Sequence, residues 1–167
     1  VPAGAGPRVV TRIEYQGAPP KFERQGRKSG LDDGLVQRGS GASRKIVADN
    51  WPNRARKRLA AQDHPSDKVD SVRIRITVPR GLVAASNGRP LGVDRNDDGT
   101  VTWNWLVSTP ISNYNVALNI GPYREVTRRY PSVAGDTIPV TYWVLPENVA
   151  QGEKLADEIL DHLRFYE

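Results

Sequence analysis

Alternation of apolar and polar residues is the strongest pattern in this sequence, and it predicts β-strands. The pattern is clearest over residues 71–78, where Val72, Ile74, Ile76 and Val78 are separated by Arg and Thr. A period of two places the apolar side chains on one face, so a sheet with one buried and one solvated face is expected. Further strands are predicted at residues 9–15, 82–86, 101–107, 114–120, 123–130 and 137–145.

Short turn sequences separate several of these segments. Their Gly and Pro residues supply the positive or fixed φ angles that tight antiparallel connections require. The turn pairs are Asn87-Gly88, Asp98-Gly99, Gly121-Pro122 and Gly135-Asp136. The sequence therefore predicts a mainly β fold, either an antiparallel β-sandwich or a curved, saddle-like sheet.

The last segment, residues 147–167, changes to a helical period. Asn148 and Gln151 are spaced to cap the start of this helix. Its predicted buried stripe is Leu155, Ile159, Leu163 and Tyr166, with Ala156 and Leu160 beside them. Two earlier segments lack a regular period: residues 16–45 are predicted to form a long basic loop, and residues 46–68 a turn or short helical piece.

The composition limits the kinds of reactive and metal-binding groups that this chain can supply. The 167 residues include no Cys and two His, and 24 basic residues against 19 acidic ones give a net charge of +5. Thiolate nucleophiles and Cys-ligated zinc are excluded, and His64 and His162 are too far apart in the sequence to indicate a zinc site. No segment is predicted to span a membrane. The composition leaves the cellular location open.

Three further patterns have alternative explanations. Asp94–Gly99 resembles the opening of a calcium-binding loop, but Trp105 occupies the twelfth position, so a hairpin turn is favoured over a weak cation site. The basic cluster Arg54–Arg58 beside Trp51 is either a solvated rim or a weak polyanion site; nucleic-acid binding is not favoured. Trp103 and Trp105 fall on one face, which favours a core role over a ligand platform.

Several ordered motifs resemble the aminopeptidase N family of zinc metallopeptidases. They are the segments NWPNRAR at 50–56, DHPSDK at 63–68, ITVPRGLVAASNG at 76–88, VTWNW at 101–105 and TPISNYNVALNIG at 109–121. Together they extend the resemblance over roughly residues 46–145.

The resemblance implies a domain division and a role. In that family a saddle-shaped N-terminal β-domain precedes a thermolysin-like catalytic domain. Residues 1–146 are similar to the β-domain without its first strands, and residues 147–167 to the first helix beyond it. The family's HExxH zinc motif does not occur here, so the resemblance implies zinc and peptide hydrolysis for an intact enzyme and no activity for this segment alone.

The resemblance also implies partners and a candidate substrate site. The family's β-domain contributes loop side chains that hold the substrate's α-amino group, and Asp49 and Trp51 fall at those positions. A carboxylate can pair with an ammonium group, and an indole face can attract one. The expected partners are the missing catalytic domain and a peptide substrate, and exposed sheet edges predict self-association. The alternatives are a non-enzymatic interaction module of the same fold and a polyanion binder acting through Arg54–Arg58.

Overall fold

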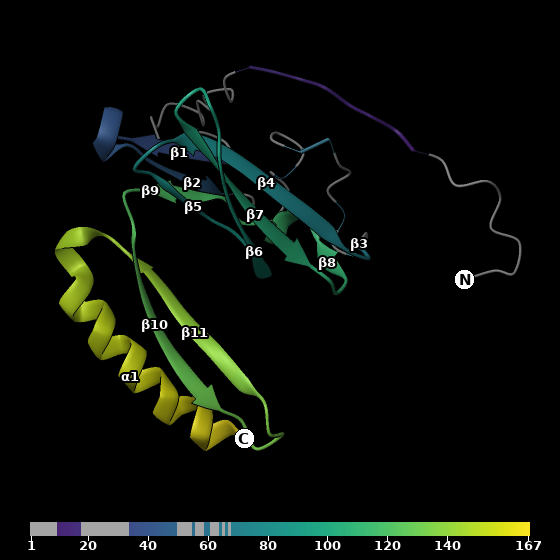
Figure 1. Ribbon diagram of the computed structural model, residues 1–167. Helices are drawn as coiled ribbons and strands as arrows, with labels where there is room; N and C mark the ends of the chain where they lie inside the picture. The colour runs from purple at the N-terminus through teal and green to yellow at the C-terminus, as the bar shows by residue number, and fades with distance from the viewer. Residues whose placement is uncertain are drawn as a thin grey trace, which may run out of the picture.

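The computed structural model describes residues 10–17, 34–49, 55, 59–60, 64, 66 and 68–167, which form a mainly β, antiparallel fold with a C-terminal helix (Figure 1). The strands are β1 (Gly34–Arg38), β2 (Lys45–Asp49), β3 (Lys68–Val69), β4 (Val72–Pro79), β5 (Val83–Ala85), β6 (Arg89–Arg95), β7 (Thr100–Val107), β8 (Ile111–Ser112), β9 (Asn119–Gly121), β10 (Arg124–Pro131) and β11 (Thr137–Val144). The helices are η1 (Gly41–Ser43), η3 (Asn113–Asn115), η4 (Pro146–Asn148) and α1 (Val149–Tyr166). The predicted fold class is confirmed.

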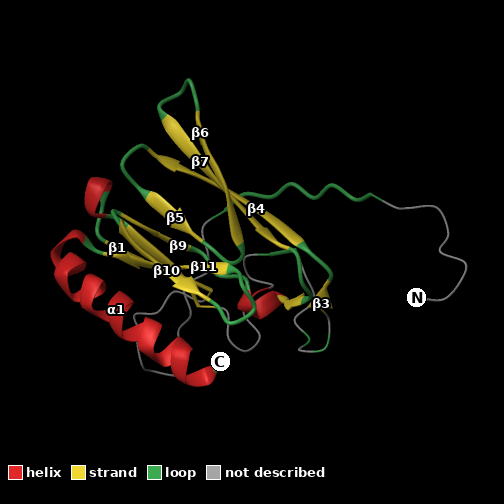
Figure 2. Cartoon of the chain, turned by 60° about the horizontal axis from the view of Figure 1, so that its bottom comes forward, coloured by secondary structure: helices red, strands yellow, loops and turns green. Residues whose placement is uncertain are grey.

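Two antiparallel sheets, whose strands are yellow in Figure 2, contribute residues to one apolar core. The first has the strand order β1-β2-β9-β5, and the second has the order β4-β7-β6. Val78 and Val101 from the second sheet pack with Ala84 and Ile120 from the first, and Leu82 completes the buried cluster. β3 pairs with β8, and β10 pairs with β11 in a separate hairpin.

The register of β4 against β7 confirms the predicted alternation. Ile76 is opposite Trp103 and Val78 is opposite Val101, and these residues face or border the core. Between them, Thr77 is opposite Thr102 on the other face, where their hydroxyl groups form a hydrogen bond of 2.8 Å. Paired residues share a face, so each strand's alternation supports the other's.

β6 is a strand that the sequence did not indicate. Its segment contains Pro90 and Gly92, two residues that disfavour strands. The structure accommodates both at an irregularity, because the pairing with β7 shifts register between Pro90 and Gly92. β6 lies at the edge of its sheet, where a proline without an N–H group is tolerated.

The strand predicted at residues 9–15 is wrong for its described part. Residues 10–17 are extended without strand pairing, and Val10 and Ile13 are 86% and 60% exposed. Alternation shows which side chains share a face, but a strand also needs a neighbour to accept its backbone hydrogen bonds.

Three loop and turn boundaries also need correction. The loop predicted over 16–45 contains β1 and η1, and the turn predicted over 46–68 begins with β2. β1 and β2 pair with each other, and this pairing orders a segment of weak strand propensity. The strand predicted over 114–120 is mostly η3 and coil, and only its end belongs to β9.

Helix α1 packs on one face of the β10–β11 hairpin (Figure 1). Its buried residues are Gly152, which has no side chain, and Ala156, whose side chain is a methyl group, and their small size allows a close approach to the hairpin. A Cβ at Gly152 would lie 2.8 Å from Val144 Cγ1. The predicted stripe is therefore only partly correct, since Leu155 is 40% and Tyr166 84% exposed.

Polar contacts fix this packing at the middle and at the C-terminal end of α1. Arg128 donates to Asp157 through Nε (2.6 Å to Oδ1) and Nη2 (3.3 Å to Oδ2). At the helix end, Glu167 accepts hydrogen bonds from the hydroxyl groups of Tyr130 (2.7 Å) and Ser132 (2.6 Å). Asn148 is the N-cap residue, but its side chain makes no capping hydrogen bond, contrary to the prediction. Among the described helices, none is both long and apolar enough to span a membrane.

We expect acid to weaken the docking of α1. The hydrogen bonds from Arg128 hold the pKa of Asp157 below its ordinary value. Because the pKa is lower in the folded than in the unfolded state, the pair stabilises fully above the unfolded-state pKa and is lost as pH falls through the folded-state pKa. Thermal melts followed by circular dichroism should therefore show a stability loss below about pH 4 that is reduced in Asp157→Asn.

Asp161→Asn is the matched control. Asp161 pairs with Arg164 within the same helix and does not contact the hairpin through this pair. Its replacement should leave the acid sensitivity of docking in place. Equal acid sensitivity in Asp157→Asn and the unmodified chain would contradict the prediction.

Candidate functional site

The two residues predicted to contact a substrate lie at or beyond the end of β2. Asp49 is the last residue of β2, and its backbone is opposite Gly34 of β1. Trp51 lies outside the described residues, as do Arg54 and Arg56–Arg58 of the basic cluster. The substrate role of Asp49 and Trp51 and the polyanion role of Arg54–Arg58 remain predictions.

The residues that the structure describes do not fit a zinc site. In the described part of the chain, no group of three or more His, Asp or Glu side chains is placed to hold a metal ion. His64 Nδ1 lies 2.6 Å from the hydroxyl of Ser66, and His162 is exposed on α1. No step of a metal-dependent reaction is therefore assigned to these residues.

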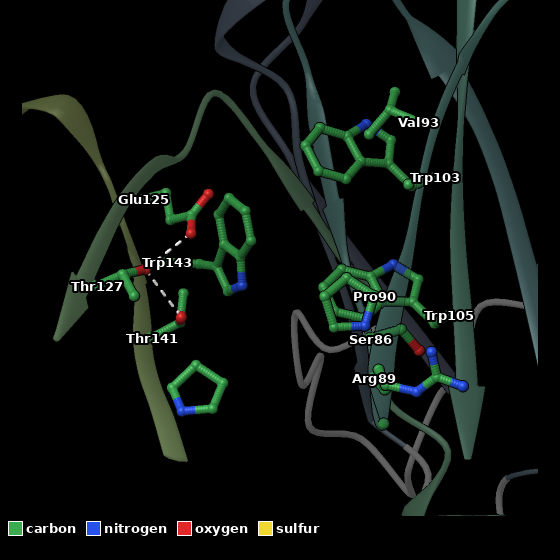
Figure 3. Close-up of a pocket in the computed structure, with 13 residues that line it drawn as sticks. Ser86, Arg89, Pro90, Val93, Trp103, Trp105, Glu125, Thr127, Thr141 and Trp143 are labelled. Atoms are coloured by element: carbon green, nitrogen blue, oxygen red, sulfur yellow. Dashed lines mark hydrogen bonds between the residues drawn. The ribbon is translucent and has the colours of Figure 1, made fainter. Parts of the chain in front are cut away.

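A cavity that we call the tryptophan cleft lies between the β4–β7–β6 sheet and the β10–β11 hairpin (Figure 3). Its volume is about 650 Å³. Trp143 of β11 reaches across it and meets Trp103 and Trp105 of β7 edge to face. The ring centroids are 5.7 Å and 6.4 Å apart, with interplanar angles of 87° and 82°. Trp143 is therefore an aromatic bridge between the hairpin and the sheet.

The two tryptophans of β7 differ in their hydrogen bonding. Trp105 is 5% exposed, and its Nε1–H group donates to the carbonyl oxygen of Ala84 at 2.9 Å. Trp103 Nε1 is buried and has no hydrogen-bond partner among the described residues. A buried donor without an acceptor costs free energy, so this group has unused capacity to bind an acceptor.

Few polar groups border the cleft, and several of them are paired with each other. Thr127 of β10 donates to Glu125 at 2.7 Å, and its hydroxyl lies 2.9 Å from that of Thr141 on β11 (Figure 3). The hydroxyl of Ser86 donates to the carbonyl of Ala117 at 2.7 Å. Apolar walls with few polar groups are typical of binding sites.

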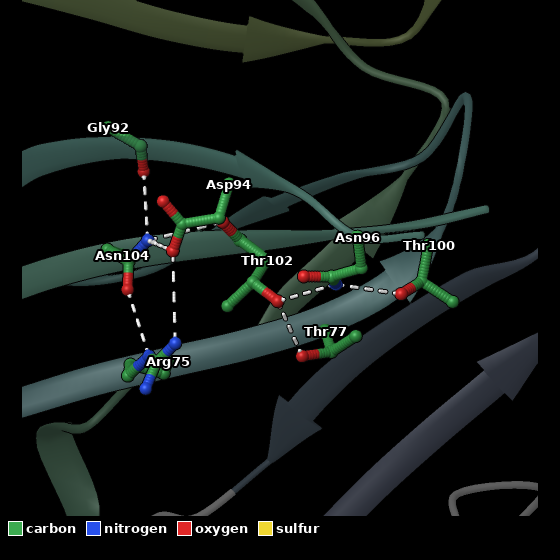
Figure 4. Close-up of polar contacts among 8 residues, drawn as sticks. All are labelled: Arg75, Thr77, Gly92, Asp94, Asn96, Thr100, Thr102 and Asn104. Atoms are coloured by element: carbon green, nitrogen blue, oxygen red, sulfur yellow. Dashed lines mark hydrogen bonds and ion pairs between the residues drawn. The ribbon is translucent and has the colours of Figure 1, made fainter. Parts of the chain in front are cut away.

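The opposite face of the β4–β7–β6 sheet carries a polar network (Figure 4). Arg75 Nε donates to Asn104 Oδ1 at 3.1 Å, and Asn104 Nδ2 donates to Asp94 Oδ2 at 2.9 Å. Asn96 Nδ2 donates to the hydroxyl groups of Thr100 and Thr102 at 2.8 Å and 3.0 Å. The network satisfies buried polar groups of β7, which gives it a structural role.

The Asp94–Gly99 segment forms the predicted hairpin turn. The Asn96 N–H donates to the Thr100 carbonyl at 3.1 Å, and Gly99 has a φ of +81°. Thr100 donates through both its backbone N–H and its hydroxyl to Asp98, and these bonds lower the pKa of that carboxyl. The oxygen side chains thus fix the connection between β6 and β7.

Comparison of structures identifies known proteins with a similar fold, whereas comparison of sequences finds no match. No family model and no curated protein matches the sequence. The fold is similar to M1 zinc metallopeptidases. A variant from Deinococcus radiodurans bound to a Tyr-Ser-Ala substrate matches with a TM-score of 0.60 and 23% identity over 75% of this chain. A two-domain M1 enzyme variant bound to L-arginine matches with a TM-score of 0.58 and 22% identity over 77%.

This chain spans only a small part of those proteins. It covers 27% of the first structure and 30% of the second. A third structure, an M1 zinc metallopeptidase from Deinococcus radiodurans, matches with a TM-score of 0.57 and 24% identity over 66% of this chain and 24% of its own. At this identity the comparison establishes the fold, and it agrees with the family resemblance of the sequence motifs.

The sequence prediction missed the tryptophan cleft. It placed Trp103 and Trp105 on one face, which the structure confirms, because both pair with neighbours on the core side of the sheet. The contribution of Trp143 depends on the position of the hairpin relative to the sheet. The sequence signal that could have suggested the cleft is Trp143 itself, a large aromatic residue on the face of β11 that points away from the helix.

Proposed function

We propose that this chain is the non-catalytic β-domain portion of a zinc-dependent metallo-aminopeptidase and forms one wall of its active-site cleft. The observation that carries the proposal is the likeness of its fold to M1 zinc metallopeptidases, of which it spans 24–30%. The sequence motifs of that family, quoted above, support the same assignment. In the intact enzyme the reaction would be removal of N-terminal residues from peptides.

The chemistry of this chain fits a scaffold rather than a reaction centre. Its described residues do not assemble a metal site, and the hydroxyl groups of Ser86 and Thr127 in the tryptophan cleft donate hydrogen bonds to neighbouring protein groups. We infer that metal and catalytic groups are supplied by the catalytic domain, and that this chain supplies Asp49 and Trp51 toward the substrate amine. An ammonium group would pair with the carboxylate and lie against the indole face.

Hydrolysis of an aminoacyl chromogenic amide and zinc content test the proposal. Both should be absent from the 167-residue chain and present in a longer chain that continues beyond Glu167 into the proposed catalytic domain. Absence from both chains would favour a non-enzymatic interaction module. Stoichiometric zinc in the short chain would contradict the proposal.

The role of Asp49 has its own test in the longer chain. Asp49→Asn should raise KM for the amide about tenfold while kcat changes little, because a charge-assisted contact to the substrate amine is lost. Asp70→Asn is the control, since Asp70 is exposed between β3 and β4. A KM unchanged by Asp49→Asn would remove that residue from the substrate site and leave the scaffold proposal standing.

A further inference from the structure

Three arginines line a second cavity, which we call the arginine pocket. Arg80 follows β4, Arg95 ends β6 and Arg124 begins β10, and all three border one cavity of about 540 Å³. No acidic residue lines it. Side chains from three separate parts of the sequence therefore bring positive charge to one concave surface.

These arginines differ from the paired arginines of the protein. Within the described part of the chain, none of the three forms an ion pair or a side-chain hydrogen bond. By contrast, Arg75, Arg128 and Arg164 lie beside Asp94, Asp157 and Asp161, respectively. Three unpaired guanidinium groups around one cavity create a positive potential that favours an anion.

Arg95 lies on the apolar face of its sheet. It is opposite Val101 of β7, which in turn is opposite Val78 of β4, and both valines belong to the core. Its neighbour Asp94 is on the other face, in the polar network with Asn104. The alternation of side chains along β6 thus places Arg95 on the apolar face of the strand and Asp94 on the opposite face, where this carboxylate cannot pair with Arg95.

The remaining walls are apolar and aromatic. Leu82 and Val101 are buried, and Val93 and Trp103 border both this pocket and the tryptophan cleft. Figure 3 shows Val93 against the nitrogen-bearing edge of Trp103, whose buried Nε1–H has no acceptor. The pocket therefore combines an apolar wall, a tryptophan whose buried indole N–H has no acceptor among the described residues, and three arginines.

We propose that the arginine pocket binds a phosphate monoester of an aromatic alcohol. Guanidinium groups donate paired hydrogen bonds to phosphate oxygens, and three positive charges suit a dianion better than a monocarboxylate. The aryl group would contact Val93 and Trp103. The site is separate from the proposed peptidase role, because it includes neither Asp49 nor Trp51.

Titration calorimetry with phenyl phosphate tests the proposal on the whole chain. Arg95→Gln and Arg124→Gln should each weaken binding about tenfold, because each removes charge-assisted hydrogen bonds. Both side chains are exposed, so the variants are expected to fold. Arg73→Gln is the matched control: it removes the same charge from β4 beside Arg75 and the polar network, and should change the affinity less than twofold.

Three other ligands test the contributions of the phosphate and the aryl group to binding, and the source of the ligand. Benzyl alcohol, which lacks the phosphate, should not bind, and inorganic phosphate should bind more weakly than phenyl phosphate. A short peptide containing phosphotyrosine distinguishes the source: tighter binding than phenyl phosphate would assign a protein ligand, and equal or weaker binding a small molecule. Phenyl phosphate binding should shift the Trp103 indole N–H resonance, which is identified by its loss in Trp103→Phe.

Results of two kinds would overturn the proposal. The first is no measurable binding of phenyl phosphate at low salt, which would leave Arg95 as a charge that only keeps the sheet edge soluble. The second is an equal loss of affinity in Arg73→Gln and Arg95→Gln, or resonance shifts centred away from Trp103. Either result would indicate general attraction of anions to a basic surface.

Discussion

Replacement of Gly88 by Ala is expected to destabilise the protein by about 3 kcal/mol or more. Gly88 connects β5 to β6 with a φ of +86°, a conformation that L side chains rarely adopt. An added Cβ would overlap the carbonyl group of Leu106 and lie 2.8 Å from the backbone N of Val107. These are backbone atoms of the central strand β7, so they cannot move aside as a flexible side chain can.

Gly99→Ala separates the steric effect from the dihedral effect. Gly99 has a similar φ of +81°, but an added Cβ would have no atom within 4 Å. It should cost about 1 kcal/mol, the cost of a left-handed conformation alone. Urea unfolding followed by circular dichroism measures both variants. Equal losses would show that the overlap with Leu106 is relieved at little cost.

Truncation of Trp105 is expected to have the other large effect. Trp105→Ala should cost about 3–5 kcal/mol, because it removes a buried indole and leaves a cavity between the two sheets. Marginally stable domains have only about 5–15 kcal/mol in total, so much of the chain should unfold near room temperature in mild denaturant. The measurement is the urea midpoint at constant slope.

Conservative replacements distinguish packing from hydrogen bonding at the two tryptophans of β7. Trp105→Phe should cost about 1–3 kcal/mol beyond Trp103→Phe, because it leaves the Ala84 carbonyl without its donor. Trp103→Phe removes a donor that has no partner in the described structure. A larger loss in Trp103→Phe than in Trp105→Phe would contradict this assignment of the hydrogen bonds.

The sequence predicted the elements whose local pattern and partners agree. β4 and β7 alternate regularly and pair with each other over their full length, so local preference and sheet pairing favour the same faces. β10 and β11 are also close to their predicted ranges, since a short turn joins them. Helix α1 was predicted from its period of four.

The failures come from interactions between distant segments. Pro90 and Gly92 disfavour a strand, so the sequence pattern did not predict β6. The strand forms because β7 supplies a pairing partner and the register shift accommodates both residues. The apolar alternation at residues 10–15 gave a false strand because no such partner is present within the described residues. On α1, the predicted burial of Ala156 is confirmed, whereas Gly152 is buried without having been predicted, because its small size permits close contact with the hairpin.

The candidate sites were harder to predict than the fold. The tryptophan cleft needs Trp143 from β11 to meet two residues of β7, and the arginine pocket needs three arginines from separate strand ends. Neither arrangement has a fixed spacing in the sequence. By contrast, the hairpin turn within Asp94–Gly99 was predicted because the hydrogen bonds that close it, among Asn96, Asp98 and Thr100, are local.

The register shift in β6 also limits what can attach to the outer side of that strand. All seven residues of β6 are exposed, and its only partner in the described structure is β7. An incoming strand would meet no N–H donor at Pro90 and a local twist at Gly92, where φ is +115°. Only Val93–Arg95 offers a regular run of backbone donors and acceptors, too short for stable strand addition. The irregular backbone of β6 thus disfavours the addition of further strands at this open edge, even though no described element covers it.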